Sequence, residues 1–164
     1  GYVTSPVHNG ARAMRTGMPP AGANVESYSP IEQTIALPSD LASAQLRFWR
    51  QRTWGDASHA AARLWARSPG DLPRTEAELR SAVFATDYFY VIAIRGDGSL
   101  RWFLVERVHD PAWREITLDL SSLAGETVRL QFGTYNNGAG GRSATYLDGV
   151  SLTLCAVTAL PRNE

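Results

Sequence analysis

The chain contains 164 residues, the length of one ordinary domain, and a chain of this length can bury a sizeable core. Sixteen basic residues balance sixteen acidic ones, so the positive excess typical of nucleic-acid-binding proteins is excluded. Hydrophobic residues make up 44%, which excludes a disordered chain, and all sixteen basic residues are arginine, which excludes Schiff-base, P-loop and kinase-type lysines.

The first half of the chain predicts three strands bounded by prolines and glycines. A short strand is expected within residues 11–16. Apolar and polar residues alternate from Ile31 to Leu37, and Pro38 closes this strand because proline cannot donate to a sheet ladder. Alternation returns from Ala44 to Gln51. One face of this third strand is expected to carry Ala44, Leu46 and Phe48.

From residue 55 to residue 86 the apolar period changes to that of helices. Asp56 fits the N-cap of an alanine-rich helix that extends to about Arg67. Thr75 followed by Glu78 is a capping-box pair and predicts a second short helix. We therefore expect a helical insertion at about 55–86. Its alternative purposes are to cover an open sheet edge, to mask a ligand-binding face or to present a partner surface.

The remaining sequence is rich in β-branched and aromatic residues and predicts further strands. They are expected at residues 87–95, 100–108, 114–120, 127–135 and 145–154, with a long Asn/Gly loop from 136 to 143 before the last one. No βαβ alternation is present. Seven or eight strands, most of them after the helical segment, predict an all-β antiparallel sandwich in which residues 1–164 form a single domain.

An ordered series of motifs runs through this β-rich half. It comprises Tyr88-Phe89-Tyr90-Val91, the runs 116–121 and 123–132, and Tyr146-Leu147-Asp148-Gly149-Val150. The series resembles the jelly-roll β-sandwiches of the galactose-binding-like superfamily, which include carbohydrate-binding modules and MAM-like domains of bacterial extracellular proteins. The resemblance covers about residues 11–155 without the insertion. It implies a non-catalytic, extracellular module that binds a polysaccharide or glycan, although this fold hosts many ligands.

The resemblance also implies a structural calcium ion. In many such modules an aspartate of the last strand binds calcium together with backbone carbonyls of the N-terminal region, and Asp148 occupies that position here. Calcium prefers hard oxygen ligands of this kind. Gly149 stands where the family often has a second acid, so the other ligands stay unassigned. The alternative is that Asp148 caps or turns the strand.

Aromatic and amide side chains near strand ends are the candidates for a sugar site. Modules of this superfamily often stack aromatic rings on pyranose faces, while polar groups bond the hydroxyls. The alternative for each tryptophan is ordinary packing, and packing explains Trp65 and Trp113 better than binding does. The candidate carbohydrate-binding residues are Trp49, Trp54, Trp102, Tyr135, Asn136, Asn137 and Arg142.

Enzymatic chemistry finds little support in the sequence, and we expect no catalytic residues. The three histidines lack a metal-binding spacing, and no Gly-x-Ser-x-Gly elbow is present. Three carboxylates, Glu106, Glu115 and Asp119, are candidates for a glycosidase pair. We expect them instead on solvated faces of antiparallel strands, opposite arginines such as Arg101, Arg107 and Arg129.

Cys155 is the only cysteine, which excludes an intrachain disulfide and cysteine-rich zinc sites. No apolar run approaches the roughly 18 residues of a membrane span, so membrane insertion is not expected. The chain begins at Gly1 without methionine, and we interpret it as a processed protein or as one module of a larger secreted one. The alternative function is a structural or adhesive module that assembles with other subunits at the cell surface, in a filament, a surface layer or a secreted protease.

Overall fold

The computed structural model describes residues 1–53 and 72–157. The expected helix at 56–67 and both Trp54 and Trp65 lie outside the described residues. The described elements, in chain order, are β1 (Tyr2–Val3), β2 (Ala13–Gly17), β3 (Glu26–Ala36), β4 (Leu41–Thr53), α1 (Glu76–Ser81), β5 (Tyr88–Ile94), β6 (Leu100–Glu106), β7 (Asp110–Asp119), the 3-10 turn η1 (Ser121–Leu123), β8 (Thr127–Asn137) and β9 (Ala144–Ala156).

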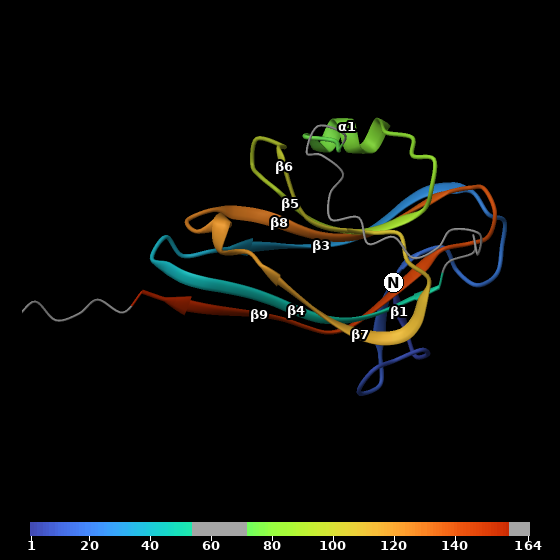
Figure 1. Cartoon of the computed structure of the whole chain (residues 1–164), viewed down its shortest axis with the longest axis horizontal. Helices are drawn as coiled ribbons and strands as arrows, with labels where there is room; N and C mark the ends of the chain where they lie inside the picture. Colours follow the sequence, from blue (N-terminus) through green and yellow to red (C-terminus); the bar gives the residue numbers. More distant parts are fainter. Residues whose placement is uncertain (54–71, 158–164) are drawn as a thin grey trace, which may run out of the picture.

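The strands form two antiparallel sheets that pack face to face (Figure 1). One sheet has the order β1-β2-β9-β4-β7 and the other has the order β3-β8-β5-β6. Helix α1 lies over the outer side of the β3-β8-β5-β6 sheet, whereas the N-terminal loop projects from the outer side of the other sheet (Figure 1). The predicted all-β antiparallel sandwich with a short helix is confirmed.

Several strands are longer than the sequence pattern predicts. β3 begins at Glu26 rather than at Ile31 and passes through Pro30 without a break, with its register to β8 unshifted from end to end. Proline is tolerated at this position because β3 is an edge strand that, among the described strands, pairs with β8 alone. β7 likewise begins at Asp110 rather than at Arg114.

The inner faces of both sheets form one apolar core. The predicted inward face of β4 is confirmed as far as Phe48, whose ring meets Phe132 edge-on with centroids 5.1 Å apart and Phe89 with centroids 6.3 Å apart. Beyond Phe48 the same alternation turns Arg50 and Arg52 inward, and both are completely buried. The core therefore ends in a cluster of charged side chains at one end of the sandwich.

This charged cluster corrects one expectation about the carboxylates. Glu106 is not on a solvated face: it is 1% exposed because the alternation of β6 turns it inward. Its two oxygens accept from Nε and Nη2 of Arg50 at 2.8 and 3.2 Å, and Arg50 Nη1 donates to Asp110 at 3.0 Å. Arg52 Nη1 donates to the backbone carbonyl of Glu106 at 2.7 Å, and burial lowers the pKa of Arg52 to about 10. A buried ion pair needs such bonds to offset its desolvation.

Candidate functional site

The outer face of the β3-β8-β5-β6 sheet carries a cluster of five aromatic side chains. We call this surface the tyrosine face; it consists of Tyr28, Tyr88, Tyr90, Trp102 and Tyr135. Residues 72–84, which include α1, pack on it through Leu72, Leu79 and Phe84. The predicted capping pair begins α1, since the Thr75 side chain accepts from the backbone N–H of Glu78 at 3.2 Å.

On the tyrosine face, hydrogen bonds to the covering segment or to the sheet hold the polar atoms of Tyr28, Tyr90, Trp102 and Tyr135. Tyr28 donates to the carbonyl of Ala82 at 2.8 Å, and Trp102 Nε1 donates to the carbonyl of Pro73 at 2.7 Å. Tyr90 donates to Gln131 Oε1 at 3.0 Å. Burial raises the pKa of Tyr28 to about 12. These rings act as a second core under α1, so they offer little surface for a ligand to stack on.

Two of the candidate sugar-binding aromatics therefore occupy packed positions. Tyr135 lies on the outer face of its sheet, but its side chain is completely buried there, because Tyr28, Phe84 and Tyr88 surround its ring at centroid distances of 4.7 to 5.4 Å. Trp102 is partly buried beneath the segment that carries Pro73. The structure fits the packing alternative for Trp102, and Tyr135 is packed as well.

The polar candidates in the Asn/Gly loop are bonded internally. Asn136 is completely buried, and its Nδ2 donates to Asn24 Oδ1 at 2.6 Å and to the carbonyl of Val25 at 2.8 Å. Asn137 Nδ2 donates to the carbonyl of Ala85 at 2.9 Å, and Arg142 reaches the carbonyl of Gly22 at 2.5 Å. These side chains tie the loop to neighbouring segments, so they position backbone rather than present free amides.

The outer face of the other sheet carries a smaller aromatic cluster at the surface. We call it the tryptophan face; it consists of His8, Trp49 and Trp113. The His8 ring stacks on Trp49 with centroids 3.9 Å apart and planes 12° apart, and it meets Trp113 edge-on at 5.6 Å. Both tryptophans are half-buried, and His8 is exposed. Of the candidate aromatics in the described chain, Trp49 alone lies in an open surface cluster.

Trp49 sits at the centre of three strands, which bring charged groups to the edge of the cluster. It pairs with Glu115 of β7 and with Asp148 of β9. Glu115 forms an ion pair with Arg47, and the two side chains are partly exposed on the same face as Trp49. Trp113, which the sequence assigns to packing, is half-buried and meets the His8 ring edge-on. Strand alternation places residue 113 on the same face as Glu115, and that signal predicts the surface position.

Asp148 anchors the N-terminal loop against this face. One carboxylate oxygen accepts from the backbone N–H groups of His8 at 2.8 Å and Asn9 at 3.0 Å, and the other accepts from Gly149 N–H at 2.7 Å. Burial raises the pKa of this carboxyl, but the N–H groups of Asn9, His8 and Gly149 outweigh burial and leave the pKa below its ordinary value. The same contact presents His8 to Trp49. The sequence gives no sign of this role for His8.

The surroundings of Asp148 do not fit a calcium site. Calcium requires oxygen ligands, whereas the N-terminal region presents N–H donors to this carboxylate, and their positive ends would repel a cation. Within residues 1–53 and 72–157, no group of three or more His, Cys, Asp or Glu side chains could hold a metal. The bond from Gly149 N–H fits the alternative that Asp148 caps the strand, and the bonds from His8 and Asn9 add an anchor for the N-terminal loop. Calcium ligation stays a prediction that this geometry does not support.

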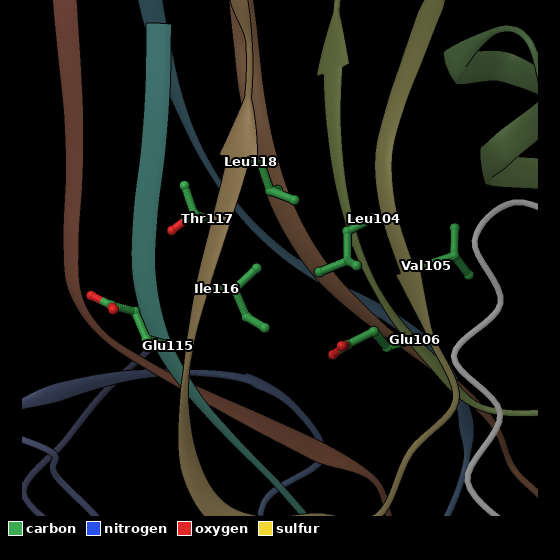
Figure 2. A pocket seen from close by; sticks show the side chains of 7 residues that line it. All are labelled: Leu104, Val105, Glu106, Glu115, Ile116, Thr117 and Leu118. Atoms are coloured by element: carbon green, nitrogen blue, oxygen red, sulfur yellow. The ribbon is translucent and has the colours of Figure 1, made fainter.

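The three carboxylates considered as a glycosidase pair do not converge. A cavity of about 180 Å³ opens between β6 and β7, and Glu106 points into it from β6 while Glu115 turns to the other side of β7 (Figure 2). Glu106 is bonded to Arg50, and Glu115 to Arg47. Asp119 accepts from the backbone N–H of Ser121 at 2.8 Å. Hydrolysis of a glycosidic bond needs two carboxyls that flank the same bond, and this arrangement does not supply them.

Comparison with known proteins finds solved structures of similar fold. No protein-family model and no curated protein matches the chain. Among solved structures, TmCBM61 in complex with β-1,4-galactotriose is similar at a TM-score of 0.53 and 11% identity, over 93% of this chain and 80% of that chain. A family 16 carbohydrate-binding module gives 0.49 and 10%, over 93% and 83%. The CBM22 tandem domain from Paenibacillus barcinonensis gives 0.49 and 15%, over 99% and 39%.

The similarity to TmCBM61 defines the class of the fold. The chain has the all-β sandwich fold found in carbohydrate-binding modules, as the resemblance to the galactose-binding-like superfamily implies. At 11% identity the likeness concerns the fold and leaves the ligand open. Within the described part of the chain, no helix is both long and apolar enough to cross a membrane.

Proposed function

We propose that this chain is a non-catalytic module of a secreted or cell-surface protein and that it binds carbohydrate on the tryptophan face. The observation that carries the proposal is the surface cluster of His8, Trp49 and Trp113. The fold supports it, since the similar module TmCBM61 was solved with β-1,4-galactotriose. The ligand expected here is a neutral glycan.

The chemistry of the tryptophan face suits such a ligand. Aromatic rings bury the C–H faces of a pyranose and exclude water from them. The partly exposed ion pair of Arg47 and Glu115 offers donors and acceptors to sugar hydroxyls beside the rings. Because the two charges cancel, they favour a neutral sugar over a charged one. Calcium has no part in this proposal.

The proposal is tested by measuring binding to a panel of soluble polysaccharides that includes β-1,4-galactan, by affinity electrophoresis and then by calorimetry. Trp49→Ala should weaken binding by at least about tenfold, because it removes the central ring of the cluster. The matched control is Tyr2→Ala, which removes an aromatic ring that is 73% exposed outside the cluster and should leave affinity unchanged. Thermal unfolding of both variants verifies that they are folded.

Two results would contradict the proposal. The first is that the wild-type protein binds no polysaccharide of the panel. The second is that Trp49→Ala binds as tightly as the wild type, which would move the sugar site away from the tryptophan face.

A further inference from the structure

The last strand has a long unpaired edge on the side opposite β4. β2 pairs with β9 only from Ala144 to Leu147, and β1 pairs with β2 rather than with β9. Within the described residues, no strand pairs with β9 on this side beyond Leu147, although β4 follows its other side as far as Ala156. The unpaired stretch is therefore about as long as an average strand. Its backbone groups on this side are available to another strand.

A groove lies between this edge and β3 of the opposite sheet. Its volume is about 560 Å³, and the strands that border it are β3 and β9, with β1 and β2 at one end. The walls are mostly apolar and include core residues that are only partly covered. The apolar lining includes Ile31 and Ile35 of β3, Val150 and Leu152 of β9, and Met14 of β2. The sandwich core thus opens to solvent on this side.

The two strands that border the groove differ in how they are protected. β3 carries Pro30 and Glu32, and a proline or a charged side chain on an edge strand disfavours pairing with another strand. Residues 149–157 contain neither a proline nor a charged side chain. In this stretch Val150 is 49% exposed and Leu154 is 39% exposed. The edge of β9 is therefore open to a further strand, whereas the edge of β3 is guarded.

We propose that a second copy of this chain docks here, with the β9 strands of the two copies paired antiparallel across a two-fold axis. The surface is self-complementary, as such an axis requires: each copy offers an unpaired apolar strand and a groove that can receive the leucines of its partner. When residues 150–156 of the two copies pair antiparallel, the β2 strand of each copy lies beyond one end of the paired segment, because β2 pairs with residues 144–147. The formal net charge of zero and the uncharged edge impose no repulsion between the copies.

This inference does not depend on sugar binding and is tested by the oligomeric state of the wild-type chain. Light scattering after size exclusion should show a monomer–dimer equilibrium between about 1 μM and about 1 mM. Val150→Lys and Leu154→Lys each place a charge in the contact and should raise the dissociation constant by at least about tenfold. The matched control is Thr117→Lys on the exposed edge strand β7, which should dimerise like the wild type.

Hydrogen exchange supplies a second measurement that does not require a variant to fold. On dimerisation, protection should rise with concentration at amides within residues 150–156 and stay constant at the edge of β7. A chain that stays monomeric at about 1 mM overturns the proposal. So does a dimer that resists both lysine variants at β9, or one whose new protection lies elsewhere, because the contact would then use another surface.

Discussion

The two outer faces of the sandwich both carry aromatic side chains, but they differ in what covers them. The tyrosine face lies under α1 and its flanking residues, and the Tyr28 and Tyr90 hydroxyl groups bond to the carbonyl of Ala82 and to Gln131 of the sheet. The tryptophan face is only partly covered by the short N-terminal loop, whose exposed His8 stacks on Trp49. The first surface is therefore built like a core, and the second like a binding surface.

This difference shows that the number of aromatic residues on a face does not identify a ligand site. A ring contributes to binding only if solvent reaches one of its faces before the ligand arrives. On the tyrosine face the rings already gain their stabilisation from packing, so a sugar would have to displace α1 to reach them. On the tryptophan face the cluster keeps part of its surface in water. The two faces should therefore respond in opposite ways to truncation.

The largest effect is expected from Tyr90→Ala on the tyrosine face. Tyr90 is 1% exposed and packs beneath residues 72–84, so its truncation should reduce the free energy of unfolding by about 3–5 kcal/mol. Sugar affinity of the folded fraction should not change. Urea denaturation and calorimetry measure the two quantities. If Tyr90→Ala instead weakened sugar binding at full stability, the assignment of core and binding faces would have to be reversed.

A smaller loss is expected from Gly133→Ala, which tests how closely the tyrosine rings pack on the sheet. A Cβ atom at this position would lie 2.1 Å from Cζ of Tyr90. The ring cannot move aside freely, since Tyr90 is buried and bonded to Gln131. The substitution should therefore cost about 1–3 kcal/mol in denaturation experiments. As a control, Gly96→Ala meets no atom within 4 Å and should be close to neutral.

The same contrast explains which parts of the fold and of the candidate site could be predicted from the sequence. Alternation along β4, and the capping pair of Thr75 and Glu78, are local signals, and both features appear as expected. The position of Trp49 on an outer face follows from the same alternation. The burial of Tyr135 does not, because it depends on which segment folds over the sheet. A local pattern assigns a face to a residue but does not reveal what covers that face.

The buried charges and the anchor at Asp148 lay beyond prediction for a related reason. Arg50 continues the inward face of β4, but the sequence does not show that Glu106, 56 positions later, supplies its partner. His8 and Asp148 lie at opposite ends of the chain and meet because β2 pairs with β9. Long-range contacts of this kind are set by topology rather than by spacing in the sequence.

Asp148→Asn is expected to have a modest effect, because it weakens the cover of the tryptophan face rather than a core. Loss of the carboxylate that accepts from His8 and Asn9 should reduce the free energy of unfolding by about 1 kcal/mol at pH 7. The pKa of Asp148 is lowered in the folded state, so its contribution is present above the unfolded value of about 3.9 and is lost as the pH falls through the folded value.

Thermal unfolding of wild type and Asp148→Asn across this pH range measures that contribution. The difference between the two proteins should be constant near neutral pH and should shrink below about pH 4. The matched control is Asp97→Asn, which removes an exposed carboxylate in the turn between β5 and β6. This substitution should leave the contacts of the tryptophan face unchanged. A difference for Asp148→Asn that stays constant down to pH 2 would show that the charge of this group is not what anchors the loop.

The smallest change in stability is expected from His8→Ala, and it examines the cover of the tryptophan face directly. His8 is exposed, so removal of its stacked ring should cost only about 0.5 kcal/mol, at the lower end for an aromatic pair. The effect on sugar binding distinguishes two roles. If His8 forms part of the binding surface, affinity falls; if it only shields Trp49, affinity rises because the indole face is freed. His8→Phe keeps a ring in place without the imidazole nitrogens, and an affinity equal to that of the wild type would assign the contribution of His8 to stacking.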